Sequence, residues 1–270
     1  MFFDAKNENI NLGNTDMDFI SFGNGDKYLV MIPGLGDGIK TVRGTASAFA
    51  MMYRCFAHEY KVYVFSRKNH LESDYSTRDM AMDYKAAMDM LNIPLASVMG
   101  ISQGGMIAQY MAIDYPFLVE KLVLAVTLSR QNDTIQNVIG SWLNMAEQGD
   151  YKSIFIDTVE KSYTEERLKK YRPLYSFLGR VGKPKDLSRF IIQANSCMNH
   201  DAYNELDKIK CPTLVIGAEN DNVVGANASE EIALRVGNSR LIMYKGFGHG
   251  VYEEASDFNQ QVLEFLRSEL

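Results

Sequence analysis

Cysteine is scarce in this chain of 270 residues, which contains only Cys55, Cys197 and Cys211. The three positions lie far apart, their number is odd, and no Cys-x-x-Cys pair is present. The sequence therefore disfavours a disulfide framework and a cysteine-based metal site. We expect three buried free thiols in a reducing, cytoplasmic compartment.

Long apolar runs and an excess of basic charge are also missing. No apolar run approaches the ~18 residues that a membrane-spanning helix needs. Residues 1–6 lack the basic and apolar regions of a signal peptide. The net charge of −6 disfavours nucleic acid as a partner, because phosphate binding needs a basic surface. These absences favour a cytoplasmic enzyme that acts on a small molecule, and they leave the oligomeric state open.

Apolar runs typical of strands alternate with helical patterns over most of the chain. We expect strands at Asp18–Gly23, Lys27–Pro33, Tyr60–Ser66, Leu95–Gly100, Lys121–Thr127, Pro212–Gly217 and Arg240–Tyr244. We expect helices at Ile39–Ala57, Ser76–Leu91, Gln103–Tyr115, Gly225–Val236 and Glu253–Leu270. Asn24-Gly25, between the first two strands, is typical of a β-hairpin. Because several strands are continuously apolar, the fold class is α/β, with a mostly parallel sheet flanked by helices.

The alternation stops between Gln131 and Lys208, where the pattern is helical throughout. A helical insertion between two strands of a parallel sheet predicts a cap over the carboxyl ends of the strands. We therefore divide the chain into a core, residues 1–130 and 209–270, and an all-helical cap, residues 131–208. Some aromatic and methionine side chains of the cap are expected to line an apolar substrate pocket. The candidates are Trp142, Phe155, Tyr175 and Met198.

The segment Gly100–Gly104, with Ser102 at its centre, stands between an apolar run and a helical pattern. A Gly-x-Ser-x-Gly in that context predicts a sharp strand-to-helix turn that exposes the serine hydroxyl. Side chains two residues before or after Ser102 would collide with neighbouring elements, which explains the glycines. Ser102 is therefore the candidate nucleophile, and the alternative is an ordinary turn serine.

Two further chemical groups follow predicted strands. Asp221 lies in a short loop after one strand, and His249 lies in a glycine-rich loop after the next. A serine hydroxyl needs an imidazole to accept its proton and a carboxylate to orient that imidazole. The chain order Ser102, Asp221, His249 is the order expected when the nucleophile lies on such a turn. Since all three residues follow strands, one sheet can bring them together.

Other residues compete for these roles. Alternatives for the acid are Asp207, Glu219 and the carboxylate within residues 131–133. The remaining histidines, His58, His70 and His200, are more typical of structural or solvated side chains, although His200 in the cap is a candidate substrate contact. Residues 150–190 contain ten basic and six acidic side chains. That segment is either a solvated helix face or a surface that attracts an anionic ester or thioester.

Together these motifs resemble the α/β-hydrolase fold superfamily, in the branch that has a helical cap. The resemblance covers nearly the whole chain. It rests on Gly100–Gly105, Gly217–Asp221 and Gly246–His249, with support from Pro33–Gly36 and Tyr75–Met80. It implies an oxyanion hole formed by the backbone N–H groups of Leu35 and Gln103.

Two stretches depart from the pattern of that family. Pro33-Gly34 stands where many relatives have His-Gly, so the turn lacks a side-chain donor and has to be held in another way. Residues 67–72 contain no glycine, whereas relatives often have an Arg-Gly-x-Gly-x-Ser loop there. We therefore expect a differently built loop near the rim of the pocket.

The resulting expectation is a serine hydrolase, an esterase that cleaves a carboxylic ester or a related acyl compound through an acyl-enzyme. Ser102 attacks the carbonyl, His249 transfers the proton, Asp221 orients His249, and two backbone amides hold the oxyanion. No metal or organic cofactor is required. Two alternatives remain open. The same triad could serve C–C bond or thioester hydrolysis, or the chain could be a ligand-binding or sensor protein with low turnover.

Overall fold

The computed structural model describes residues 2–180 and 182–269, which contain an eight-stranded sheet with the order β1-β2-β4-β3-β5-β6-β7-β8. The strands are β1 (Lys6–Asn11), β2 (Asp16–Phe22), β3 (Lys27–Ile32), β4 (Tyr60–Lys68), β5 (Ala96–Ile101), β6 (Val119–Ala125), β7 (Thr213–Ala218) and β8 (Ser239–Tyr244). In this order, every neighbouring pair from β4 through β3 to β8 is parallel. At one edge of the sheet, β1 pairs with β2 and β2 pairs with β4 in the antiparallel direction. The predicted mostly parallel sheet is confirmed.

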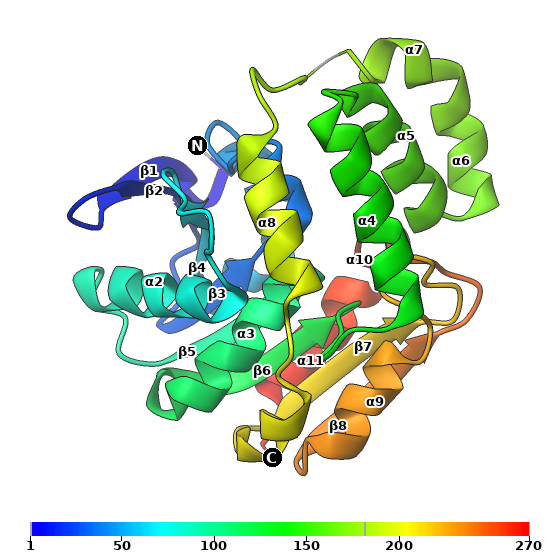
Figure 1. Ribbon diagram of the computed structural model, residues 1–270. Coiled ribbons are helices and arrows are strands. Elements are labelled where there is room, and N and C mark those ends of the chain that lie inside the picture. The colour runs from blue at the N-terminus through cyan, green and yellow to red at the C-terminus, as the bar shows by residue number, and fades with distance from the viewer. Residues whose placement is uncertain (1, 181, 270) are drawn as a thin grey trace.

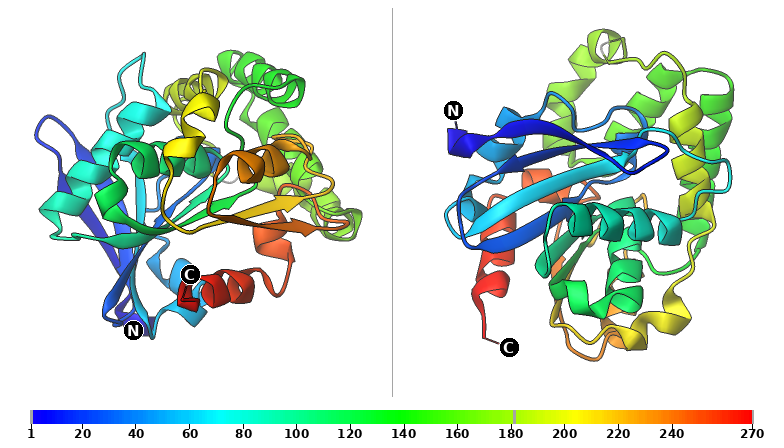
Figure 2. Two further views of the ribbon diagram at one scale, coloured as in Figure 1. Left: turned by 90° about the horizontal axis from the view of Figure 1, so that it is seen from below. Right: turned by 90° about the vertical axis from the view of Figure 1, so that its left-hand side faces the viewer.

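Helices cover both faces of this sheet (Figure 2). One face holds α2 (Thr77–Met90), α3 (Gln103–Asp114) and α9 (Ala228–Arg235), and the other holds α1 (Ala46–Met52), α10 (Val251–Glu254) and α11 (Phe258–Arg267). Along β3, Val30 and Ile32 belong to the apolar cluster of the first face, and Leu29 and Met31 to that of the second. Burial on both faces is the reason that the central strands are continuously apolar.

Between β6 and β7 the described residues form five α-helices. They are α4 (Asp133–Glu147), α5 (Tyr151–Ser162), α6 (Glu165–Tyr171), α7 (Tyr175–Leu178) and α8 (Ser188–Met198). These helices lie beyond one end of the sheet (Figure 1). Their apolar cluster includes Leu35 and Leu128, which follow the carboxyl ends of β3 and β6. These five helices, the helical layer, therefore cover the carboxyl ends of the strands, where a parallel sheet presents its functional groups.

The remaining turns of helix are short and of the 3₁₀ type. They are η1 (Phe2–Asp4), η2 (Leu35–Gly38), η3 (Arg54–Phe56), η4 (Pro116–Leu118), η5 (Arg172–Leu174) and η6 (Tyr203–Lys208). In the part of the chain that the structure describes, no helix combines the length and apolar character that crossing a bilayer requires. All three cysteines are free, but only Cys197 is buried, so the expectation of three buried thiols is wrong for Cys55 and Cys211.

The predicted hairpin at Asn24-Gly25 is wrong. Strands β2 and β3 do not pair, because β4 lies between them. A Cβ atom added to Gly25 would lie 1.9 Å from the carbonyl carbon of Glu59, so this glycine serves a close crossing of two backbone segments. The actual hairpin joins β2 to β1, a strand that the sequence analysis missed because Lys6–Asn11 contains a single apolar residue.

Two predicted helices are shorter than expected. The helix at Ile39–Ala57 begins only at Ala46, because Gly44 adopts a positive φ of 83° that ends any earlier helical run. The range Glu253–Leu270 contains the end of α10, a break and then α11. Its last residue, Leu270, lies outside the described residues.

Candidate active site

Ser102 occupies the turn between β5 and α3 with an unusual backbone. Its φ is 54° and its ψ is −120°, a conformation that costs free energy for a residue with a side chain. Two hydrogen bonds hold it there. The Ser102 N–H donates to the carbonyl of Ala125 over 2.9 Å, and the Thr127 hydroxyl donates to the Ser102 carbonyl over 2.7 Å. The neighbouring strand thus stabilises the strained turn.

The glycines around Ser102 have a steric reason. A Cβ atom would lie 2.3 Å from the Gly104 oxygen if added to Gly100, and 2.0 Å from the Ile32 oxygen if added to Gly104. At Gly105 it would lie 2.6 Å from the Cβ of Thr127. These contacts confirm the expected crowding and extend it to a third glycine.

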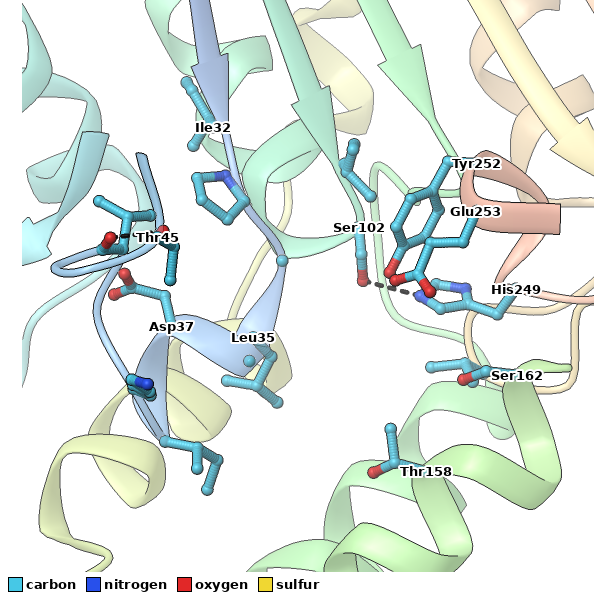
Figure 3. Close-up of a pocket in the computed structure, with 18 of the residues that line it drawn as sticks. Ile32, Leu35, Asp37, Thr45, Ser102, Thr158, Ser162, His249, Tyr252 and Glu253 are labelled. Atoms are coloured by element: carbon cyan, nitrogen blue, oxygen red, sulfur yellow. Dashed lines mark hydrogen bonds between the residues drawn. The ribbon is translucent and has the colours of Figure 1, made fainter. Parts of the chain in front are cut away.

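His249 and Asp221 converge on Ser102 from the loops after β8 and β7. The Ser102 Oγ lies 3.0 Å from His249 Nε2, and His249 Nδ1 lies 2.8 Å from Asp221 Oδ2. The dashed line in Figure 3 marks the bond between Ser102 and His249. The other carboxylate oxygen of Asp221 accepts hydrogen bonds from the N–H groups of Val223 and Val224, at 2.9 and 3.0 Å. Both His249 and Asp221 are buried, so little water competes for these bonds.

The competing residues lie elsewhere. Glu219 accepts a hydrogen bond from the Gly246 N–H instead of contacting His249, and Asp133 and Asp207 are exposed. His58 and His70 are exposed as well. The remaining histidine, His200, is buried outside the site. Of the candidate acids, the structure therefore brings only Asp221 into hydrogen-bond contact with His249.

His200 is part of the buried interior near α3. Its Nδ1 lies 2.9 Å from the hydroxyl of Thr77, and its ring packs edge-on against Tyr110. Burial lowers the pKa of His200 to about 3. His200 does not line the cavity at Ser102, so the possible substrate contact is not supported.

The loop that contains His249 is held by the end of helix α5. The Gly250 N–H donates to the carbonyl of Ser162 over 2.7 Å. A Cβ atom would lie 2.8 Å from that same carbonyl oxygen if added to Gly248, and 2.6 Å from the Tyr163 ring if added to Gly250. The two glycines beside His249 thus permit close contact between this loop and the helical layer.

A cavity of about 580 Å³ opens at Ser102 and His249. Helix α5 faces it with Thr158 and Ser162 (Figure 3). Two of the four predicted cap residues, Trp142 and Phe155, line the cavity. The other two predictions, Tyr175 and Met198, are not among its lining residues.

The two residues that do not line the cavity have other surroundings. Tyr175 packs edge-on against Phe155 and donates its hydroxyl to Glu160 over 2.8 Å. Met198 packs against the apolar cluster that the helical layer forms. Both residues therefore contribute to packing between helices. Which side chains of a helix face the cavity depends on the rotation of that helix about its axis.

One wall of the cavity was missed by the sequence analysis. Phe49, Met52 and Tyr53, from α1 and its end, line it together with Tyr252 of α10. Burial raises the pKa of the Tyr53 and Tyr252 phenols, and nearby Glu253 adds to the effect. Both hydroxyls therefore stay protonated and can donate hydrogen bonds. No signal in the sequence distinguishes these side chains from ordinary apolar positions.

Among the described residues, the Asp, Glu, Lys and Arg side chains that line the cavity are Asp37, Lys40 and Glu253. Asp37 pairs with Arg189 over 2.7 Å. Glu253 accepts the Tyr163 hydroxyl over 2.7 Å and lies 3.5 Å from Arg167. The two carboxylates are therefore neutralised by partners, and most of the remaining wall is apolar.

Two backbone amides beside Ser102 have no acceptor within their own helices. Leu35 is the first residue of η2 and Gln103 the first residue of α3, and the first N–H groups of a helix lack intrahelical partners. The turn of η2 passes close to the serine, because a Cβ atom added to Gly34 would lie 3.3 Å from the Ser102 Cβ. These amides are suited to hold a negatively charged oxygen.

The described residues contain no group of three or more His, Cys, Asp or Glu side chains that could hold a metal ion.

In the basic segment 150–190, five of the ten cations pair with carboxylates. These are Lys161, Arg167, Lys170, Arg172 and Arg189. The first four of these pairs lie at the surface, which favours the interpretation as an ordinary solvated helix face, whereas Arg189 pairs with the buried Asp37.

The fold and the site together define a class of protein: an α/β sheet with a strained serine turn, a hydrogen-bonded Ser–His–Asp set and a covering helical layer. The chain belongs to the alpha/beta hydrolase fold family, whose sequence model matches residues 27–256. The resemblance seen in the sequence is thereby confirmed.

Curated relatives are named as hydrolases of different substrates. The chain is 26% identical over 263 residues to a 2-hydroxy-6-oxononadienedioate/2-hydroxy-6-oxononatrienedioate hydrolase of Pseudomonas sp, covering 90% of this chain and 89% of that protein. It is 22% identical over 259 residues to a putative carbamate hydrolase, RutD, of Caulobacter segnis, covering 90% and 92%. The family and the named relatives support hydrolase activity, but the relatives do not share one substrate.

Solved structures share the fold at low sequence identity. MGS-M2, an alpha/beta hydrolase enzyme from a Medee basin deep-sea metagenome library, superposes with a TM-score of 0.84 at 21% identity, over 97% of this chain and 98% of that chain. The enol-lactonase from Burkholderia xenovorans LB400 gives a TM-score of 0.81 at 17% identity, over 97% and 100%.

Proposed function

We propose that this protein is a serine hydrolase that cleaves a carboxylic ester, or a related acyl compound, through an acyl-enzyme. The observation that carries the proposal is the continuous hydrogen-bonded chain from Ser102 through His249 to Asp221, which ends at a cavity. A hydroxyl 3.0 Å from an imidazole nitrogen is within reach for proton transfer. This is the arrangement that activates a serine nucleophile.

The proposed reaction has two halves. Ser102 Oγ attacks the carbonyl carbon of the ester while its proton passes to His249 Nε2. The resulting oxyanion accepts hydrogen bonds from the N–H groups of Leu35 and Gln103. When the tetrahedral intermediate collapses, the C–O bond to the alcohol breaks and His249 gives its proton to that alcohol.

Water then completes the cycle. His249 takes a proton from a water molecule, which attacks the acyl-enzyme, and returns that proton to Ser102 as the acid leaves. Asp221 accepts the Nδ1–H of His249 throughout, which keeps Nε2 free to act as the base. The amides of Val223 and Val224 fix the carboxylate in that orientation.

We assign residues 131–208 to a cap that shapes the substrate site. The proposal is supported by Trp142 and Phe155, which face the cavity from this segment. Phe49 and Tyr252 of the core line the same cavity. An apolar cavity with few charged groups suits a neutral acyl or alcohol group.

A second candidate is the hydrolysis of a C–C bond in a dioate substrate by the same three residues. This candidate is considered because the name of the Pseudomonas relative specifies a dioate. A dioate contains two carboxylates, which need cationic partners. Among the described lining residues the only lysine or arginine is Lys40. The cavity therefore favours the neutral ester over the dioate.

The test uses p-nitrophenyl esters together with a fluorophosphonate probe. A serine hydrolase should release p-nitrophenol in a burst equal to the enzyme concentration and should lose activity after stoichiometric labelling by the probe. A ligand-binding or sensor protein would show neither. Turnover of a dioate with a cleavable C–C bond, without ester turnover, would favour the second candidate.

A further inference from the structure

The turn η2, which provides the Leu35 amide, lies directly against helix α8. A Cβ atom added to Gly38 would lie 2.9 Å from the Cα of Phe190, so the two backbones are in contact. Pro33 enters this turn and offers no side-chain hydrogen-bond donor. Other residues must therefore hold the Leu35 N–H in place beside Ser102.

Asp37 is the residue of this turn that makes the fixing contacts. Its side chain has no exposed surface. Its Oδ2 accepts hydrogen bonds from Arg189 Nη2 at 2.7 Å, from the Arg67 N–H at 3.1 Å and from Gln193 Nε2 at 3.2 Å. Two of these three donors, Arg189 and Gln193, belong to α8.

Arg189 of α8 connects the turn to the end of strand β4. Its Nε donates to the Asp37 carbonyl at 3.1 Å, and its Nη1 donates to the Lys68 carbonyl at 2.6 Å. Its Nη2 donates to the Arg67 carbonyl at 2.9 Å, in addition to the Asp37 carboxylate. One guanidinium thus fixes the main chain of two core segments at the same time.

The second proposed oxyanion donor is anchored to the same helix. The side chain of Gln103 is fully buried. Its Nε2 donates to the Gln193 carbonyl at 2.8 Å and to the Ser196 hydroxyl at 3.1 Å, and its Oε1 accepts from Arg67 Nη2 at 2.7 Å. Both oxyanion donors therefore sit on elements that α8 holds.

We propose that Arg189 and Asp37 are positioning residues for the oxyanion hole, and that α8 sets the spacing between the Leu35 and Gln103 amides. This inference rests on the proposed function. A buried ion pair adds little net stability once its desolvation is counted, but it fixes geometry. Oxyanion stabilisation depends on donors held within a few tenths of an ångström, so such a contact acts on the rate of acyl transfer.

The experiment compares Arg189→Met with Arg172→Met. Arg172 is also in the cap and pairs with Glu160 and Glu165, but it makes no contact with η2 or α3. The readouts are the rate constant of labelling by a fluorophosphonate, which develops negative charge on a phosphoryl oxygen, and kcat and KM for p-nitrophenyl acetate. Arg189→Met should lower the rate constant and kcat roughly ten- to hundredfold with little change in KM. Arg172→Met should match the parent.

The amplitude of labelling separates positioning from folding. A purely structural role for Arg189 would reduce the fraction of protein that is labelled and leave the rate constant of the labelled fraction unchanged, which would overturn the proposal. If Arg189→Met does not fold, Arg189→Lys and Asp37→Asn decide in its place. Each keeps part of the contact and should give a smaller loss in rate constant. A parent-like rate constant in both would overturn the proposal, whereas a parent protein without labelling at Ser102 would refute the proposed function itself.

Discussion

The carbonyl of Ser162, at the end of helix α5, accepts a hydrogen bond of 2.7 Å from the N–H of Gly250, the residue after His249. Tyr163 and Thr164 continue this contact, since their hydroxyls donate to Glu253 and Glu254, each over 2.7 Å. The end of α5 therefore contacts the loop that contains the proposed base. Helix α8 of the same layer contacts the elements that provide the proposed oxyanion donors.

Gly250→Ala should lower kcat by about tenfold or more, because misplacement of a catalytic group by about 1 Å is costly. The added Cβ would lie 2.6 Å from the Tyr163 ring, so the loop or the helix has to move. The control is Gly237→Ala, since a Cβ there meets no atom within 4 Å. Steady-state kinetics of both variants on one ester measure the effect, and equal kcat values would contradict the account.

Asp221→Asn should reduce kcat on the order of 10³-fold or more. The amides of Val223 and Val224 should retain the amide oxygen of the asparagine on their side, which turns its NH₂ group toward His249 Nδ1. His249 would then hold its proton on Nε2 and could not accept the proton of Ser102.

Asp207→Asn is the matched control for this change, because Asp207 is an exposed alternative for the acid. It should keep the parent kcat. A silent Asp221→Asn beside a damaging Asp207→Asn would reassign the acid.

Phe155→Ala should shift the preferred chain length of the ester, because Phe155 lines the cavity. A lost apolar contact is worth roughly 1–3 kcal/mol in discrimination between substrates. The measurement is kcat/KM over a series of p-nitrophenyl esters of increasing acyl length. Phe177→Ala serves as the control, since Phe177 is 66% exposed and lies away from the cavity. An unchanged preference in Phe155→Ala would place the selective wall in the core.

His200 should make the stability depend on pH. Burial lowers its pKa to about 3 in the folded state, whereas an unfolded histidine has a pKa of about 6.5. The unfolded chain therefore binds more protons below pH 6.5. The contribution of His200 to the free energy of unfolding is therefore fully present above that pH, and it falls as the pH decreases toward 3. This group alone should lower the free energy of unfolding by about 2 kcal/mol between pH 7 and pH 5.

Urea unfolding at several pH values measures this effect in His200→Asn and His58→Gln. The slope with pH should be shallower in His200→Asn, which lacks the buried imidazole. His58 is exposed, so His58→Gln should keep the parent slope. Equal slopes in the two variants would show that His200 titrates normally.

Much of the fold was predictable because its signals are local. The continuously apolar runs indicated the central strands, and the glycines around Ser102 indicated a crowded turn. The order Ser102, Asp221, His249 then followed from three loops at strand ends, and the structure places these side chains in contact. Their catalytic roles remain a prediction.

The parts that could not be predicted depend on contacts between distant segments. Arg189 and Asp37 are 152 positions apart, and nothing near either residue indicates the other. The β4 strand separates β2 from β3, which no pattern around Asn24-Gly25 indicates. Likewise, Phe155 faces the cavity and Tyr175 supports it, because the rotation of a helix is set by its neighbours.

The most direct measurement of the central claim is the site of acylation. The parent protein is mixed with p-nitrophenyl acetate, quenched within the burst, and digested for peptide mapping by mass spectrometry. We predict one acetyl group, on Ser102. The Ser102→Ala variant should carry none and should lose activity on the order of 10³-fold or more while it remains folded. An acetyl group on another residue, or a Ser102→Ala variant that keeps half of the parent activity, would show that Ser102 is not the nucleophile.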